Sequence, residues 1–215
     1  MNWPQSALAL SAAYLLGSLP VGYVVVWVAR RIDIRAIGSG HTGGTNVLRV
    51  AGALPAVLTV LGDLAKGYGA VALAQHLAPD LALTAALAGL IAVVGHNWSV
   101  FLGFRGGVGT MTTSGAALAL MPVGIVAVSV IALVIIAARR YSSLGSLAVA
   151  AMLPMADLVG ILLGAWPAYT LIFTLGTSAM ATWALRANIA RLRAGTERRI
   201  GQTVSPGRSV ETPRC

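Results

Sequence analysis

Long apolar runs dominate this sequence and limit the folds open to it. The run at residues 7–29 is long enough to cross the roughly 30 Å hydrocarbon core of a bilayer as an α-helix. Hydrophobic residues make up 57% of the 215 residues and charged residues only 10%, whereas a soluble domain is about one quarter charged. Backbone polar groups inside a bilayer must be bonded within the protein, which favours helices. The sequence therefore predicts an all-α, polytopic membrane protein.

The distribution of basic residues predicts how the chain threads the membrane. Basic residues follow the run 7–29, and arginines close the runs that end near residues 138 and 185. Since Lys and Arg are favoured on the cytoplasmic side, we expect the N-terminus outside and the C-terminus inside. Placing all 15 Lys and Arg on that side requires seven helices, two of them a short pair divided at 121–124. The predicted helices are 7–29, 54–77, 81–94, the pair within 111–138, 147–163 and 168–185, with 62–67 interrupting the second run.

The remaining composition sets the domain organisation and excludes some classes of function. We expect one integral-membrane domain at 1–193 and a basic, flexible cytoplasmic tail at 194–215. The net charge of +9 lies at the ends of apolar runs, so topology explains it and nucleic-acid binding is not expected. The single cysteine, Cys215, excludes a disulfide framework, and no spacing of His, Cys, Asp or Glu indicates a metal site.

Three polar, glycine-rich stretches interrupt this apolar background, at 38–49, 95–110 and 139–146. Such backbone at membrane depth is tolerated only where it is buried in protein or lines a cavity. In the first stretch, glycines allow peptide N–H groups to converge on an oxyanion. Arg49 adds a charge suited to phosphate. The expected donors and glycines are Gly38, Ser39, Gly40, Thr45 and Asn46. The alternative, a turn that only reverses the chain, weakens when three such loops lie on one side.

The second and third stretches repeat this chemistry. Gly106, Gly107 and Gly109 lead into a helix, whose N-terminus attracts anions. Arg105 either contacts ligand or marks the cytoplasmic edge, and the edge role is slightly favoured. Ser143 and Ser146 share one face before another helix. His41 and His96 are candidate bases or ligands, although a lone histidine near a polar loop more often has a structural role, and Asp157 is as readily a polar contact between helices.

In the order of these motifs, the sequence resembles one known family. The matching segments are 38–40 with 43–49, Asp63 with 66–67, 95–96 with 104–109, Tyr141 with Ser143 and Ser146, and 188–197. The chain is similar to the integral-membrane, acyl-phosphate-dependent glycerol-3-phosphate acyltransferases of bacteria over nearly its whole length.

The resemblance implies a seven-helix enzyme of the bacterial inner (cytoplasmic) membrane with its active site facing the cytoplasm. Such an enzyme moves an acyl chain from acyl phosphate to the sn-1 hydroxyl of glycerol-3-phosphate, in phospholipid biosynthesis. The implied catalytic residues are Ser39, Arg49, Ser143 and Asn188. The implied substrate-binding residues are Gly38, Gly40, Thr45, Asn46, His96, Arg105, Gly106, Gly107, Gly109 and Ser146. No cofactor is implied, membrane lipids are the expected surroundings, and a monomer is our working assumption.

Two departures from the family pattern leave other functions open. Val108 stands where the family has lysine and Leu185 where it has histidine, and neither side chain donates a hydrogen bond. In addition, His41 replaces a usual asparagine and Ala187 a usual glutamate. The alternatives are a catalytically impaired paralogue that binds a phosphorylated lipid or a partner, an acyltransferase with another acceptor, and, last, a transporter of phosphate esters.

Overall fold

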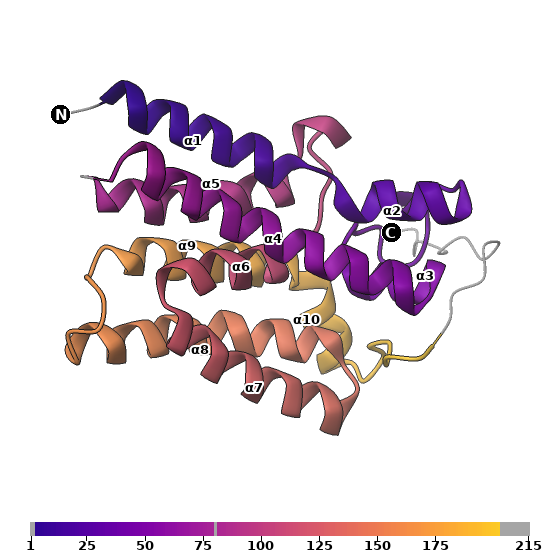
Figure 1. The fold of residues 1–215 in the computed structure, drawn as a ribbon. Coiled ribbons are helices and arrows are strands. Elements are labelled where there is room, and N and C mark those ends of the chain that lie inside the picture. The colour runs from indigo at the N-terminus through magenta and orange to yellow at the C-terminus, as the bar shows by residue number, and fades with distance from the viewer. Residues whose placement is uncertain (1–2, 80, 203–215) are drawn as a thin grey trace.

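The fold is a bundle of helices, seen in a computed structural model that describes residues 3–79 and 81–202. Figure 1 shows the long helices lying roughly side by side, with α2, α3 and α10 gathered at the end opposite the start of α1. The α-helices are α1 (Trp3–Ser18), α2 (Val21–Arg30), α3 (Gly44–Ala51), α4 (Ala53–Leu77), α5 (Ala82–Asn97), α6 (Thr110–Leu120), α7 (Pro122–Arg139), α8 (Ser142–Leu162), α9 (Thr170–Ala184) and α10 (Arg186–Arg193), with 3₁₀ turns η1 (Ile34–Ala36) and η2 (Val100–Leu102).

Five stretches of the described chain are long and apolar enough to cross a membrane, namely Trp3–Arg30, Ala53–Leu77, Ala82–Leu102, Pro122–Arg139 and Ser142–Leu162. The predicted break near residue 121 is confirmed, because α6 ends at Leu120 and α7 begins at Pro122, whose fixed φ suits the first position of a helix. The predicted number of crossings and the orientation of the termini stay predictions.

The expectation of one continuous helix at 7–29 is wrong. The chain breaks at Leu19 and Pro20 between α1 and α2, because a proline inside a helix removes a backbone donor and clashes with the preceding turn. The carbonyls left unpaired by the break accept hydrogen bonds from α4 and from the loop that follows α5. Ser99 Oγ donates to Ser18 O at 2.6 Å and Lys66 Nζ donates to Leu19 O at 3.0 Å.

The predicted interruption at 62–67 is also wrong, since α4 is continuous from Ala53 to Leu77. Its two charged residues form a buried pair, Lys66 Nζ lying 2.9 Å from Asp63 Oδ1, so the helix can carry them between its neighbours. Gly67 and Gly115 let α4 and α6 approach closely: a Cβ at Gly67 would meet Thr112 O, and one at Gly115 would meet Leu64 O.

Small residues fill the interior between these helices. Ala9, Ala13, Ala70, Ala88 and Ala92 pack where α1, α4 and α5 meet, as close helix packing in lipid requires. A second core joins α5, α6, α7, α8 and α9 around Phe173 and Leu153. Asp157 of α8 accepts hydrogen bonds at 2.7 Å from Thr170 and Thr174 of α9, which confirms its role as a polar contact between helices.

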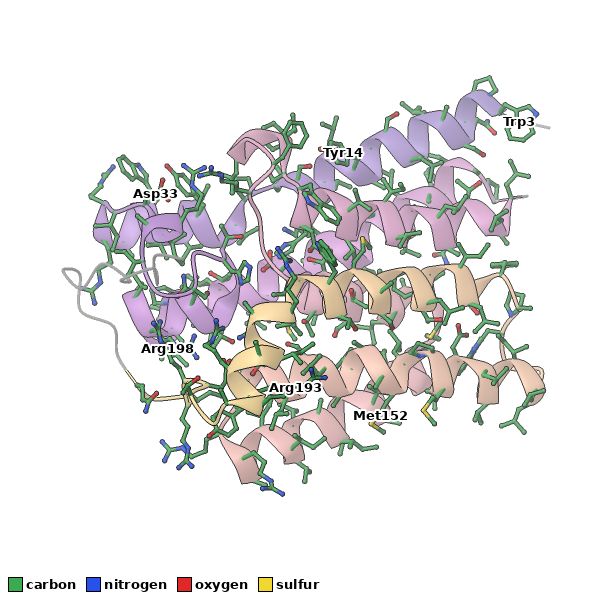
Figure 2. All side chains as sticks on the ribbon, turned by 180° about the vertical axis from the view of Figure 1, so that it is seen from behind. Trp3, Tyr14, Asp33, Met152, Arg193 and Arg198 are labelled. Carbon is green, nitrogen blue, oxygen red and sulfur yellow. The ribbon has the colours of Figure 1, made fainter. Side chains whose placement is uncertain are left out.

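Figure 2 shows that charged residues lie mainly at one end of the bundle: Asp33, Arg193 and Arg198 are there, and Trp3 is at the other. Residues 194–202, the first part of the predicted tail, contact α3, α8 and α10 through hydrogen bonds. Residues 203–215 lie outside the described part, so a flexible tail stays a prediction.

Candidate anion-binding site

The first polar stretch is half loop and half helix. Residues 38–43 form the loop, and Thr45, Asn46 and Arg49 lie on α3. The Asn46 side chain holds the loop in place: its Nδ2 donates to Ile37 O and His41 O, each at 3.0 Å, and its Oδ1 accepts from Ser39 N at 3.2 Å. Gly38, at φ +70°, packs against Asn46 so closely that a Cβ would strike Oδ1. The Asn46 amide is therefore used within the protein, although Asn46 also lines the cavity.

The second polar stretch crosses the end of α5. Gly106 N donates to Asn97 O at 3.1 Å and Gly107 N donates to His96 O at 3.2 Å. These two N–H groups are therefore used within the protein, because the loop closes on the last carbonyls of α5, which would otherwise be unpaired. The chain then enters α6, with Gly109 before the first turn at φ +86°.

A buried charge cluster supports this second stretch. Asp63 is 2% exposed and His96 5% exposed. Asp63 Oδ1 lies 2.9 Å from Lys66 Nζ and 3.5 Å from His96 Nδ1. The other ring nitrogen of His96, Nε2, lies against Gly107, where any Cβ would strike it. Glycine at position 107 thus leaves the space that the His96 imidazole occupies.

The third stretch belongs to a helix rather than preceding it. Ser142, Ser143 and Ser146 lie in the first two turns of α8, which begins at Ser142. Ser143 is 3% exposed, and its Oγ donates to Glu197 Oε1 at 2.9 Å.

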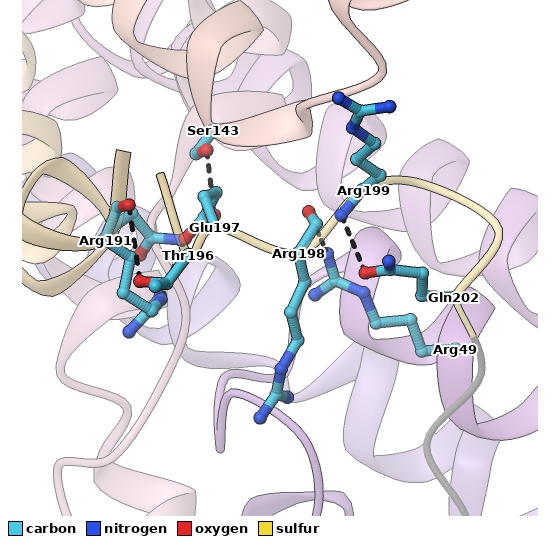
Figure 3. Close-up of polar contacts among 9 residues, drawn as sticks. Arg49, Ser143, Arg191, Thr196, Glu197, Arg198, Arg199 and Gln202 are labelled. Atoms are coloured by element: carbon cyan, nitrogen blue, oxygen red, sulfur yellow. Dashed lines mark hydrogen bonds and ion pairs between the residues drawn. The ribbon is translucent and has the colours of Figure 1, made fainter. Parts of the chain in front are cut away.

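Glu197 reaches the site from the segment after α10 (Figure 3). Its Oε1 also accepts from Asn188 Nδ2 at 2.7 Å and its Oε2 from Arg191 Nε at 2.8 Å. Burial, the largest single influence, raises the pKa of Glu197, but the hydrogen bonds from Asn188, Arg191 and Ser143 together hold this pKa below its ordinary value. Glu197 is thus a charged anchor that joins α8 to α10.

These elements surround a cavity of about 160 Å³, against roughly 10–15 Å³ for one water, so it has room for a small polar ligand. The start of α3 (Gly43, Gly44 and Thr45), the start of α6 (Gly109, Thr110 and Met111) and the start of α8 (Ser142 and Ser143) all line it. A helix N-terminus presents unpaired N–H groups and partial positive charge. Three of them around one cavity favour an anion.

Arg49 adds a full positive charge to the same wall. Its Nη2 donates to Arg198 O at 3.4 Å (Figure 3), and its buried Nε has no hydrogen-bond partner in the described chain. Burial is the main cause that lowers the pKa of Arg49, and Arg198 lowers it further, while Glu197 opposes both. The guanidinium of an arginine that lines a cavity is a donor suited to a ligand oxygen.

Most predicted site residues meet at this cavity, which Ser39, Thr45, Asn46, Arg49, His96, Gly109, Ser143, Ser146 and Asn188 line together. Gly40, Arg105, Gly106 and Gly107 instead line a second cavity of about 380 Å³, which shares Ser39 and His41 with the first. Gly38 lines neither. Arg105 is exposed, so its place at the rim agrees with the edge role.

Several residues of the first cavity were not predicted as part of the site. Asp63, Thr110 and Ser142 line it directly, and Glu197 holds two of its walls together. The buried Asp63–Lys66 spacing was a usable signal for the first, since paired charges in an apolar helix mark functional positions. Within the described residues no group of three His, Cys, Asp or Glu is placed to hold a metal ion.

Two of the residues that depart from the family pattern replace a hydrogen-bonding side chain with an apolar one, and both line the first cavity. Val108 and Leu185 lie in its wall, and Leu185 is 4% exposed. Neither offers a donor, so this part of the wall is apolar.

Comparison with known proteins confirms the family that the motifs indicated. Residues 7–195 match the family model described as glycerol-3-phosphate acyltransferase. The chain is 43% identical to glycerol-3-phosphate acyltransferase 2 of Moorella thermoacetica over 91% of its length and 97% of that protein. It is 40% identical to glycerol-3-phosphate acyltransferase of Halalkalibacterium halodurans, covering 91% and 95%.

Two solved structures have the same fold. Both are crystal structures of PlsY (YgiH), described as an integral membrane glycerol 3-phosphate acyltransferase. The glycerol 3-phosphate form aligns with a TM-score of 0.81 at 30% identity, over 91% of this chain and 96% of that one. The lysophosphatidic acid form aligns at 0.78 and 29% identity, over 92% and 96%.

Proposed function

Since the chain belongs to the glycerol-3-phosphate acyltransferase family, we propose that it transfers an acyl chain from acyl phosphate to the sn-1 hydroxyl of glycerol-3-phosphate. The products are lysophosphatidic acid and inorganic phosphate. The matched region covers nearly all of the helical part of the chain, so the proposal concerns the whole of the predicted domain at 1–193.

The observation that carries the proposal is the meeting of three helix N-termini and Arg49 around one cavity. Both substrates carry phosphoryl groups, and such groups are stabilised by helix N-termini and bidentate arginine. The relatives' names add the acceptor, and the solved relative was crystallised in a glycerol 3-phosphate form. Together these support a phosphate ester as the ligand here.

The reaction we propose needs positioning more than a covalent enzyme intermediate. The acceptor oxygen forms a bond to the acyl carbon, the acyl carbon–oxygen bond to phosphate breaks, and the hydroxyl proton leaves with the phosphate. Acyl phosphate already has a good leaving group, so holding two anions in line and stabilising the developing charge supplies the acceleration. Ser39, Arg49, Ser143 and Asn188 are the residues we assign to this task.

We place the enzyme in the bacterial cytoplasmic membrane, with the acyl chain toward lipid and the cavity facing the cytoplasm. The apolar stretches of the described chain support a membrane position. The arginines at the cavity end support a cytoplasmic orientation. A monomer suffices for this arrangement, since all the assigned residues come from one chain.

Val108 and Leu185 support a second candidate, an impaired paralogue or an enzyme for a different acceptor. Losing a group that stabilises charge in the transition state commonly costs about 10²–10³ in rate. Two apolar residues in the cavity wall therefore predict weak turnover of glycerol-3-phosphate.

The test is acyl transfer by the purified protein in lipid, with labelled acyl phosphate and glycerol-3-phosphate. We expect labelled lysophosphatidic acid, a fall of at least about 10² in rate for Arg49→Ala, and a gain for Val108→Lys combined with Leu185→His. An inactive wild type with an active double variant would establish the impaired paralogue instead. If wild type and the double variant are both inactive, with glycerol-3-phosphate and with a panel of related polyols as acceptors, the acyltransferase proposal is contradicted.

A further inference from the structure

His41 lies at the boundary of the two cavities. Ser39 and His41 line both the 160 Å³ cavity and the 380 Å³ cavity beside it. This pair therefore lies where the two cavities adjoin. His41 is partly buried, so its ring belongs to the cavity walls rather than to the open surface.

The backbone on either side holds the imidazole in this position. Asn46 Nδ2 donates to His41 O at 3.0 Å and Asn46 Oδ1 accepts from Ser39 N. Gly40, at φ +73°, takes a left-handed conformation that only glycine adopts readily. The loop is thus fixed by bonds that do not involve the ring, and neither ring nitrogen of His41 has a hydrogen-bond partner among the described residues.

His41 shares the first cavity with two apolar side chains. Val108 and Leu185 share this cavity with His41 and provide no donor. The other imidazole of the cavity, His96, is already placed between Asp63 and Gly107. His41 is therefore the cavity's histidine with both nitrogens available to a ligand.

Burial and the positive charges around His41 both favour the neutral form of its ring. Burial is the main cause that lowers the pKa of His41, and the charges of His96, Arg191 and Arg186 lower it further. The charged or titratable side chains that act on the ring or share a cavity with it are Arg35, Arg49, Asp63, His96, Arg105, Arg186 and Arg191. Asp63 is the one acid among these, and it is paired with Lys66. A phosphoryl dianion bound in the cavity would act in the opposite direction, because a nearby negative charge favours the protonated ring.

Building on the proposed function, we propose that His41 is a substrate-binding residue that donates a hydrogen bond to a phosphoryl oxygen and takes up a proton when the phosphate ester binds. The ring supplies a donor where Val108 and Leu185 supply none, and the bound dianion stabilises the imidazolium. Binding is then linked to pH: the affinity for the phosphoryl group rises as pH falls from 8 to 6. The shared ligand chemistry is a phosphoryl group, from either glycerol-3-phosphate or acyl phosphate.

The kinetic test compares the wild type with His41→Gln, which keeps a donor but cannot be protonated. We expect the KM of the variant relative to wild type to grow as pH falls from 8 to 6, by about tenfold for each unit by which binding raises the pKa of His41, because the amide keeps the donor but cannot take up the proton. Because the second ionisation of the substrate near pH 6 is common to both enzymes, it cancels in this ratio. The substrate whose KM responds is the one that His41 contacts.

His76→Gln is the matched control, since His76 lies in the last turn of α4 and lines neither cavity; its KM ratio should stay near one. A KM ratio for His41→Gln that does not change with pH would overturn the proposal. So would a pH dependence confined to kcat, which would instead make His41 a general base.

Calorimetry separates this inference from the proposed function. Wild type titrated with glycerol-3-phosphate, or with inorganic phosphate alone, in two buffers of different ionisation enthalpy should show proton uptake near pH 7, and His41→Gln should show less. Proton uptake without acyl transfer would refute the proposed reaction and support the role of His41. Acyl transfer with equal proton uptake by both proteins would do the reverse.

Discussion

At the scale of single residues, Glu197 shows how this site keeps a charge buried. Its side chain is 4% exposed, and burying an ionised carboxylate is costly unless hydrogen bonds replace water. Ser143, Asn188 and Arg191 supply those bonds from α8 and α10. Ser143 and Asn188, which we assign to substrate binding, are therefore held in place by Glu197, which was not predicted as a site residue.

Replacing Glu197 by Gln should destabilise the protein by roughly 1.5–3 kcal/mol, the range for hydrogen bonds to charged groups. The amide keeps the shape of the side chain but loses the charge that faces Arg191. Thermal unfolding in detergent measures the change. Thr196→Ala, at the exposed neighbouring position, should change the free energy of unfolding by less than about 0.5 kcal/mol, and equal losses in the two variants would contradict the anchor role.

The same carboxylate predicts how stability depends on pH. Because the pKa of Glu197 is lower in the folded protein than its ordinary value, its stabilisation is fully present above that value, about 4.3. It is lost as pH falls through the folded pKa, where both states become protonated. The stability difference between wild type and Glu197→Gln should thus narrow below about pH 4.3. A difference that stays constant down to pH 3 would show that charge is not its origin.

At the scale of elements, close contact between α4 and α6 sets the geometry of the cavity. Gly67 and Gly115 place the two backbones so near each other that a Cβ on either would meet a main-chain oxygen. α4 brings Asp63 to the cavity and α6 brings its N-terminus. The distance between two walls of the site is therefore set by glycines that lie outside it.

Gly67→Ala should destabilise the protein and lower its activity, because the new methyl group would meet Thr112 O rather than a side chain that can move. The matched control is Gly69→Ala in the same helix, where a Cβ would meet nothing within 4 Å. Alanine there should be neutral or stabilising by up to about 1 kcal/mol, from helix propensity. Thermal unfolding and acyl-transfer rates of the two variants decide the matter, and a tolerated Gly67→Ala would show that the two helices can separate.

At the scale of the whole molecule, residues from distant parts of the sequence meet at one end of the bundle. α3, the start of α8 and the segment after α10 lie at this end, as Figure 1 shows. The turn between α8 and α9 lies at the opposite end of the bundle. If the positive end faces the cytoplasm, these two regions lie on opposite sides of the membrane.

Labelling of single cysteines tests this orientation. In a Cys215→Ser background, Ala165→Cys lies in the exposed turn between α8 and α9, and Ala194→Cys follows α10 at the cavity end. A membrane-impermeant maleimide should label residue 165 in intact cells and residue 194 only after the inner membrane is opened. The reverse pattern would place the cavity outside, and labelling of both in intact cells would rule out the predicted topology.

The sequence alone determined the class of fold and most of the chemistry of the site. Apolar length and the scarcity of charge predict membrane helices, and glycine, serine and arginine between them predict an anion site, because both predictions follow from local composition. The sequence also predicted the break near Pro122 from the proline and glycine within 121–124, although Pro154 lies inside α8 without ending that helix.

Tertiary structure decided the rest, because it depends on which groups meet. The chain breaks at Pro20, and the freed carbonyls accept hydrogen bonds from Lys66 of α4 and from Ser99 in the loop after α5. Gly106 and Gly107 could have offered their N–H groups to a ligand, but the end of α5 accepts them. Glu197 enters the site only when the segment after α10 folds back onto α8. Packing determines which groups far apart in the chain become hydrogen-bond partners, and a local sequence pattern does not predict these pairs.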